Sequence, residues 1–166
     1  LAMRGNRQPI PQIDSYIVLP REQLAFLDEV MIDVEGGRNG QGYIYATSRV
    51  HPWNWYFVCH FHQDPVMPGS LGLETIVQAI QAYAIRADLA RGMRSPHFDH
   101  VENQEMIWKY RGQVLSDSDS VNVEVHINRV ERVNGSIKIY ADASLWKGAL
   151  RIYEFKNVCV GISESQ

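Results

Sequence analysis

The chain has 166 residues, a length that fits one domain with a sizeable hydrophobic core. Hydrophobic residues make up 45% and charged residues 21%, a composition that excludes an intrinsically disordered chain. The formal net charge of -3 gives no general attraction to nucleic acid or to an anionic membrane surface, so neither partner is expected.

The two cysteines, Cys59 and Cys159, are too few for a secreted disulfide scaffold and are expected to be free thiols. No apolar run approaches the roughly 20 residues that cross a bilayer, and no signal-peptide pattern opens the chain. These observations favour a cytoplasmic location.

Residues 1–12 are polar, contain two prolines and begin without Met, which favours a linker or an expression remnant outside the core. Residues 13–163 are expected to form a single domain. Such a start is typical of a domain taken from a longer polypeptide.

The first half of the domain predicts mostly extended structure after a short helical turn at 21–26. Glycines and Asn in Gly36–Gly42 predict a hairpin turn, because they adopt the positive φ angles that such turns need. Alternating residues predict a strand at 43–50. The aromatic segment 51–61 is rich in β-formers and is expected to be extended, since His51 precedes a proline.

Residues 70–91 lack proline and consist mostly of good helix formers, which predicts the long helix of the chain. Apolar residues recur on one face at spacings of four, three and four, and other faces are largely apolar too. A helix that is apolar nearly all round is a buried one. The recurring residues are Leu73, Val77, Ile80 and Ala84.

The remainder predicts a loop at 92–104 and then four antiparallel strands joined by tight turns. One alternating apolar face is formed by Val121, Val123, Val125 and Ile127. A sheet with one helix on a single face is an α+β layer architecture. The expected strands are 105–115, 120–133, 137–146 and 149–162, with a turn at Asn134–Ser136.

The segment before the long helix carries the candidate chemistry. Pro65, Pro68 and Gly69 exclude regular helix or central strand, so the helix is expected to begin near Ser70. The first N–H groups of a helix lack internal partners and carry the positive end of its dipole. Gly69 lets a ligand approach these donors closely, so this position can stabilise an oxyanion.

A lone carboxylate, Glu74, lies one turn into this apolar helix. Ser70 can cap the helix, but a capping box needs an acidic residue or Gln at position 73, which is Leu73. Glu74 is therefore free for another role, and Gln78 follows one turn later on the same face. A buried carboxyl group without a partner stays protonated and can act as a general acid.

His60 lies in the segment that is expected to be extended, and histidine suits general-base catalysis near neutral pH. His62 would share a strand face with it, so a metal site that includes Asp64 is an alternative, although no closed ligand set is evident. Taken alone, a histidine on a strand is more often a packing or surface residue, and a Glu on an apolar helix is more often an ion-pair or partner-contact residue. A second His/Asp cluster, Pro96–His100, is expected to lie on a surface loop.

The run WYFVCHFHQDPVMPGSLGLETIVQAI, residues 55–80, resembles the active-site segment of the hot-dog-fold beta-hydroxyacyl thioester dehydratases, especially the beta-hydroxydecanoyl-acyl carrier protein dehydratase branch. The shared pieces are CHF, DPVMPG, LGLE and the following Gln. Residues 26–37 and 110–115 are also similar, so the resemblance covers most of the chain. HFHQDPVMPGSLG is most similar to dehydratase domains of polyunsaturated fatty acid and polyketide synthases.

The resemblance implies a hot-dog fold, in which a curved antiparallel sheet wraps a long central helix. It implies dehydration of a beta-hydroxyacyl thioester on the phosphopantetheine arm of an acyl carrier protein, with no metal or organic cofactor. The histidine of one hot dog combines with the acid of another, so the partner is a second copy or a tandem hot dog.

The resemblance also assigns roles to single residues. His60 takes the alpha proton, Glu74 helps to expel the beta-hydroxyl group as water, and the Gly69 N–H binds the thioester carbonyl. Further positions expected to contact substrate are Phe61, Pro68, Ser70 and Gln78, of which Gln78 is a candidate for orienting Glu74; Leu73 and Val77 are expected to line the acyl tunnel.

Three positions depart from the decanoyl branch, where Glu74 is usually Asp, Gln63 is usually Gly and Ser70 tends to be Cys. Isomerisation of the trans-2 to a cis-3 double bond therefore stays an alternative, as does a non-catalytic module that binds acyl chains. Common hot-dog thioesterase patterns are not matched. Candidates for carrier-protein docking are the basic residues Arg86, Arg91, Arg94, Lys109 and Arg111.

Overall fold

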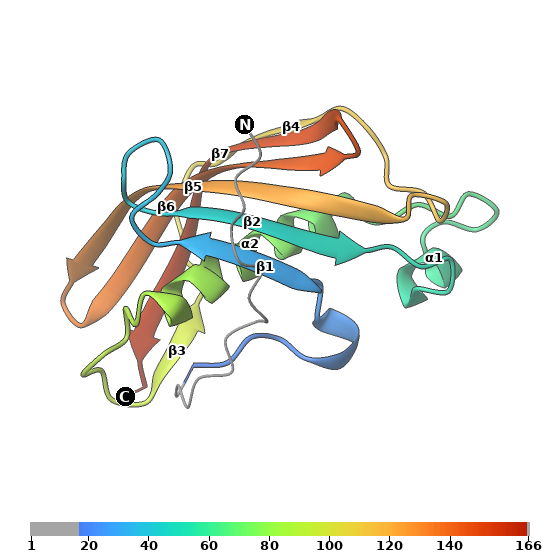
Figure 1. The fold of residues 1–166 in the computed structure, drawn as a ribbon. Helices are drawn as coiled ribbons and strands as arrows, with labels where there is room; N and C mark the ends of the chain where they lie inside the picture. The colour runs from blue at the N-terminus through green and yellow to red at the C-terminus, as the bar shows by residue number, and fades with distance from the viewer. Residues whose placement is uncertain (1–16, 166) are drawn as a thin grey trace.

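The structure, a computed structural model, describes residues 17–165 and forms one curved seven-stranded sheet around a long helix (Figure 1). The expected linker at 1–12 lies outside the described residues. In chain order the elements are η1 (Glu22–Leu24), β1 (Glu29–Asp33), β2 (Tyr43–Arg49), α1 (Trp55–Cys59), α2 (Gly69–Arg86), β3 (Pro96–Asp99), β4 (Ile107–Tyr110), β5 (Ser120–Val133), β6 (Ser136–Lys147) and β7 (Leu150–Glu164).

The sheet is antiparallel throughout, in the order β1-β2-β5-β6-β7-β3. Strand β4 also pairs with β7, at residues 153–156, whereas β3 pairs with β7 at residues 161–164. The hairpin turns fall where glycine and Asn predict them. Asn134 and Gly135 take φ angles of 48° and 76° between β5 and β6, which matches the positive φ values of a tight hairpin.

Helix α2 lies against one face of the sheet and supplies the centre of the core. Ile76, Ala79 and Ile80 are fully buried, and so is the predicted apolar face of β5. At Gly72 the helix comes so close to the sheet that an added Cβ would lie 2.3 Å from the Tyr153 ring. Only glycine allows that approach, which fixes the height of the first helical turns above β7.

The prediction of an extended segment at 51–61 is wrong, because Trp55–Cys59 forms helix α1. The Asn54 side chain accepts a hydrogen bond from the His51 N–H at 2.6 Å, which turns the chain after the proline. Tyr56 is buried in the core, so tertiary packing overrides the β-preference of the aromatic residues. His60 is the C-cap residue of α1. No strand covers residues 60–62, so the strand face that His60 and His62 were expected to share does not exist.

The long helix begins and ends earlier than predicted. It begins at Gly69 after Pro68, with no side-chain cap, so Ser70 does not cap it. It ends at Arg86 because Asp88 takes a positive φ of 50° and the Leu89 N–H bonds back to the Ala84 carbonyl. This is the Schellman arrangement, which closes a helix.

Two strand predictions also need correction. The segment expected as a loop contains β3 (Pro96–Asp99), which pairs with the end of β7 and starts with a proline, as edge strands tolerate. The strand expected at 105–115 is limited to β4 (Ile107–Tyr110), and Leu115 forms only an isolated bridge with Val66.

Candidate active site

The start of α2 is packed against aromatic side chains of β4. A Cβ added at Gly69 would lie 3.1 Å from both the Trp108 and the Tyr110 ring, so the glycine leaves the room that these rings occupy. Among the first N–H groups of the helix, that of Leu71 donates to the Pro68 carbonyl at 3.0 Å, whereas those of Gly69 and Ser70 precede the first helical hydrogen bond. The helix terminus predicted as an oxyanion site is therefore present and bordered by aromatic rings.

Gln78 holds Glu74 in place through its side-chain amide. The Gln78 Nε2 donates to Glu74 Oε1 at 2.8 Å and to the Leu24 carbonyl at 2.7 Å, while its Oε1 accepts from the Phe26 N–H at 3.0 Å. Gln78 is only 2% exposed. Both amide hydrogens are used, so the orientation of the amide is fixed by its partners. The predicted contact between Gln78 and Glu74 is thereby confirmed.

Glu74 is half-buried, not buried as predicted, because it lines an open pocket of about 430 Å³. One wall of the pocket is a single face of α2, and the other walls come from β3, β7 and the loop that follows β3. The α2 residues are Ser70, Leu73, Glu74, Val77 and Gln81; the facing residues include Phe98, Asp99, His100, Met106, Val158 and Val160.

His60 is held at the end of α1 by two backbone groups. Its N–H donates to the Tyr56 carbonyl at 2.9 Å, and its Nδ1 lies 2.9 Å from the Val66 carbonyl oxygen. A carbonyl oxygen only accepts hydrogen bonds, so Nδ1 carries the hydrogen. In the neutral imidazole this leaves Nε2 with its lone pair free to accept a proton.

One chain does not bring His60 and Glu74 into the same pocket. Within residues 17–165, His60 is not among the residues that line the Glu74 pocket, and Phe61 next to it is 57% exposed. Helix α1 and strand β3 lie at opposite ends of the molecule (Figure 1). Pro68, Gly69 and Ser70 connect the two regions, since they form the start of the helix that carries Glu74.

The remaining predictions concern a metal site and the basic residues expected to dock a carrier protein. No group of three or more His, Cys, Asp and Glu side chains in residues 17–165 could hold a metal ion. Lys109 forms an ion pair with Glu154, and Arg91 forms one with Asp88. Carrier-protein docking and a cytoplasmic location stay predictions. No helix in the described part of the chain is long and apolar enough to cross a membrane.

Sequence reasoning missed two features of the Glu74 pocket. The cluster Pro96–His100, expected on a surface loop, supplies Phe98, Asp99 and His100 to the wall. Gln81 was not singled out, although it lies seven residues after Glu74 and so falls on the same helix face. Its polarity within an apolar helix was the signal that could have found it.

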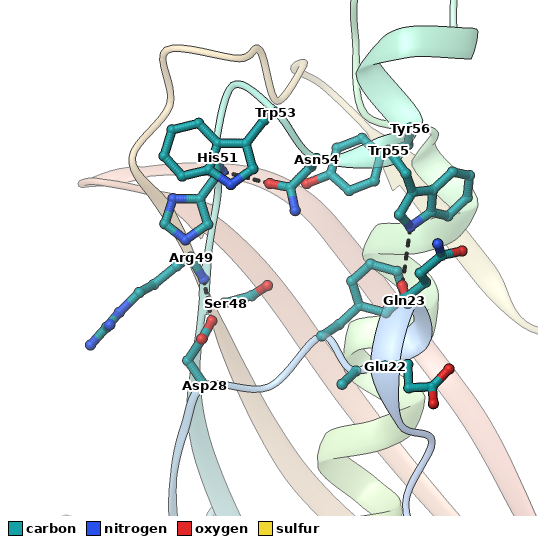
Figure 2. A pocket seen from close by; sticks show the side chains of 12 residues that line it. Glu22, Gln23, Asp28, Ser48, Arg49, His51, Trp53, Asn54, Trp55 and Tyr56 are labelled. Carbon is teal, nitrogen blue, oxygen red and sulfur yellow. Dashed lines mark hydrogen bonds between the residues drawn. The ribbon is translucent and has the colours of Figure 1, made fainter.

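A second pocket, of about 510 Å³, lies where α1 meets the segment around η1 (Figure 2). His51 stacks on Trp53 with ring centroids 4.8 Å apart, and the Trp55 Nε1–H donates to the Gln23 carbonyl at 3.1 Å. None of the predicted site residues lines this pocket. The Trp55 bond ties α1 to the same segment that Gln78 holds from α2, which links the two halves of the candidate site.

Comparison with known proteins places the chain in a family. Residues 19–156 match the FabA-like domain. The chain belongs to the FabA-like family. This FabA-like domain is 37% identical over 143 residues to one of the subunits of the polyunsaturated fatty acid synthase of Thraustochytrium sp. (strain ATCC 26185 / S-3), a match that covers 85% of the chain. The chain spans only 10% of the length of that relative.

The fold of this FabA-like domain is shared with a solved structure of low sequence identity. The dehydratase heterocomplex ApeI:P from Xenorhabdus doucetiae aligns with a TM-score of 0.55 at 12% identity, over 96% of this chain and 92% of that chain. A probable thioesterase from Bartonella henselae aligns with a TM-score of 0.47 at 14% identity, over 72% and 88%. The predicted hot-dog fold and the family resemblance are confirmed. Membership of this family supports a dehydratase-type role.

Proposed function

We propose that this domain dehydrates a 3-hydroxyacyl thioester, carried on an acyl carrier protein, to the trans-2-enoyl thioester. The observation that carries the proposal is Glu74, which the Gln78 amide holds in a pocket lined by both apolar and polar side chains. Family membership supports the reaction class, and the synthase relative supports a role in fatty acid assembly.

In the proposed reaction His60 removes the alpha proton of the thioester through its Nε2. The negative charge that develops on the thioester oxygen is stabilised by the Gly69 N–H at the positive end of α2. One preorganised donor of this kind contributes on the order of 3 kcal/mol to the transition state. The Val66 carbonyl accepts the Nδ1–H and so fixes the tautomer of His60, which leaves Nε2 as the nitrogen that can accept the proton.

Glu74 supplies the proton for the leaving group. Its Oε1 already accepts a hydrogen from Gln78, so the acidic proton belongs on Oε2. Transfer of that proton to the beta-hydroxyl oxygen breaks the C–O bond and releases water. The electron pair of the alpha C–H bond becomes the new C=C bond, and the proton on His60 returns to Glu74 before the next turnover.

A complete site needs two hot dogs in this proposal, because one chain holds His60 and Glu74 in different surroundings. A second copy, or a tandem hot dog in a longer polypeptide, places its His60 beside the Glu74 pocket of the first. The carrier protein then presents the acyl chain between them.

The direct test measures turnover of 3-hydroxyacyl and crotonyl thioesters by the wild type, His60→Ala and Glu74→Gln. Loss of a positioned acid or base is expected to lower kcat by about 10²–10⁴-fold. His62→Ala is the matched control, since it removes a nearby histidine and is expected to keep wild-type turnover. Equal rates for all four proteins would refute the proposal, and a cis-3-enoyl product seen by NMR would replace it with a dehydratase/isomerase.

A mixing experiment tests whether two chains build the site. Co-expressed His60→Ala and Glu74→Gln chains form mixed dimers in which one of the two sites keeps both groups. About half of the dimers are mixed under random pairing, so about a quarter of wild-type activity is expected. No recovery in dimers shown by mass to be mixed would place both groups in one chain's site.

A further inference from the structure

Two large apolar side chains flank His60 at the end of α1 and lie in solvent. Val58 is 84% exposed and Phe61 is 57% exposed. Helix α1 turns Tyr56 and Phe57 into the core, so Val58 is left on the solvent side of the helix. Removal of such side chains from water is favourable, and an apolar patch on a monomer often marks the place where a partner binds. Val58 and Phe61 together form the α1 tip.

The turn that carries Phe61 is closed by its own backbone. The Phe61 N–H donates to the Asp64 carbonyl at 2.9 Å, and the Asp64 N–H donates back to the Phe61 carbonyl at 3.1 Å. The Val66 N–H donates to the His60 carbonyl at 2.8 Å. Phe61 is therefore held in its exposed place by bonds within the chain, and a group that is ordered before binding loses little entropy when a partner covers it.

Phe61 and His60 form one unit. The phenyl and imidazole rings lie with their centroids 3.8 Å apart at an angle of 30°. One side of the phenyl ring therefore covers the proposed base, while more than half of the Phe61 side chain stays exposed. A surface that receives His60 must also receive Phe61.

The Glu74 pocket offers an apolar surface that suits this tip. The pocket is open to solvent, and its walls include Val77 of α2 and Val160 of β7. Within residues 17–165, neither Val58 nor Phe61 lines the pocket of its own chain. An α1 tip that covers the Glu74 pocket must therefore come from another molecule.

We propose that the α1 tip of one copy seats on the Glu74 pocket of a second copy, where Phe61 becomes part of the wall around the acyl chain; this inference rests on the proposed function. Two copies that exchange tips make the same contact twice, which closes as a two-fold dimer. Each contact brings His60 of one copy to Glu74 of the other, as the proposed reaction requires. Phe61 arrives with His60 and covers apolar surface beside the substrate.

Sedimentation equilibrium tests this surface without any substrate. Val58→Asp puts a charge on the α1 tip and is expected to weaken dimerisation by about 10²–10³-fold, since the change occurs at both contacts. Val133→Asp is the matched control, because Val133 is 51% exposed at the β5–β6 hairpin, at the other end of the molecule from α1 (Figure 1). Its dimerisation is expected to equal that of the wild type. A monomeric wild type, or a Val58→Asp dimer as tight as the wild type, would overturn the inference, and Phe61→Ser gives the same readout if Val58→Asp does not fold.

Mixed dimers with two affinity tags test the place of Phe61. A dimer of one His60→Ala chain and one Glu74→Gln chain keeps a single complete site, in which the Glu74→Gln chain supplies His60. Phe61→Ala added to the Glu74→Gln chain is expected to lower kcat/KM about tenfold, mainly by raising KM, because the acyl chain loses an apolar contact. The same change added to the His60→Ala chain alters only the incomplete site. Equal losses in both arrangements, or a loss only in the second, would refute the placement of Phe61 in the partner's pocket.

The two measurements separate this inference from the proposed function. If the wild type dimerises and Val58→Asp does not, but no thioester is turned over, the dehydratase proposal fails and the α1 tip remains the dimer surface. If the protein dehydrates thioesters while Val58→Asp dimerises like the wild type, the dehydratase proposal stands and the α1 tip is excluded as the contact.

Discussion

Gln78→Leu is the substitution for which the structure gives the clearest expected loss of stability. The leucine side chain fills a similar volume but offers no hydrogen bonds. The Phe26 N–H and the Leu24 carbonyl lose their partner together, and the Phe26 N–H is buried. Each unsatisfied buried group costs about 1–3 kcal/mol, so the free energy of unfolding is expected to fall by about 2–4 kcal/mol.

Thermal unfolding followed by circular dichroism measures this loss. For a domain of this size 1 kcal/mol shifts Tm by about 2–4 °C, so a decrease of about 10 °C is expected. Gln104→Leu makes the same chemical change at an exposed position and is expected to stay within about 2 °C of the wild type. If Gln78→Leu has the same Tm as the wild type, the Gln78 amide does not hold the 24–26 segment.

Gln78→Glu separates the acceptor role of the amide from its donor role. The new carboxylate can still accept from the Phe26 N–H, but it cannot donate to Leu24 and it meets Glu74 directly. Two carboxyl groups in contact disfavour the state in which both are ionised, and this cost grows as the pH rises. The stability difference from the wild type is therefore expected to grow between pH 5 and pH 8; a difference independent of pH would contradict the contact with Glu74.

Three further expectations concern packing, titration and thiol reactivity. Gly72→Ala is expected to lower the free energy of unfolding by about 1–2 kcal/mol in urea titrations, since overpacking exceeds the gain in helix propensity. Burial and the nearby Arg38 lower the pKa of His126 in the folded protein. As the pH falls, the unfolded chain therefore binds a proton at this histidine before the folded chain does, which favours unfolding. Between pH 7 and pH 5 the free energy of unfolding is expected to fall less steeply for His126→Gln than for the wild type. Cys59 is exposed, whereas burial raises the pKa of the Cys159 thiol, so a disulfide reagent is expected to label one thiol rapidly and the other slowly.

Each of these has a result that would contradict it. A Gly72→Ala protein as stable as the wild type would show that the Tyr153 ring moves aside freely. If the free energy of unfolding falls with the same slope between pH 7 and pH 5 in wild type and His126→Gln, groups other than His126 cause the loss of stability. Rapid labelling that survives in Cys59→Ser would place the reactive thiol at Cys159, and labelling in denaturant supplies the total of two thiols.

Most of the sheet could be predicted from sequence because its signals are local, although β3 was expected as a loop and β4 is shorter than expected. Alternation fixes which residues of β5 face the core, and Asn134 with Gly135 fixes the turn that follows. Helix α2 was predicted for the same reason, since its apolar face repeats over several turns. Its end was not, because Asp88 closes the helix by taking a positive φ that nothing in its residue type requires.

The candidate site could be predicted only in part. The run from His60 to Glu74 carries a family motif, and the contact between Glu74 and Gln78 follows from helical spacing. The aromatic segment before His60 misled, because β-forming residues fold into α1 when the core accepts Tyr56. The pocket wall from β3 depends on pairing with β7, a contact between segments far apart in sequence that no local pattern encodes.

The close packing of Trp108 on the start of α2 gives the protein a built-in optical reporter. Its indole lies beside Gly69 and stacks on Phe155 with ring centroids 5.2 Å apart, and it is 38% exposed. In the proposed reaction, a thioester bound to the Gly69 N–H would shield this indole from solvent and change the polarity around it. With Trp53, Trp55 and Trp146 replaced by Phe, the emission of Trp108 would follow substrate arrival at the helix terminus in a stopped-flow experiment, without any label and before chemistry begins.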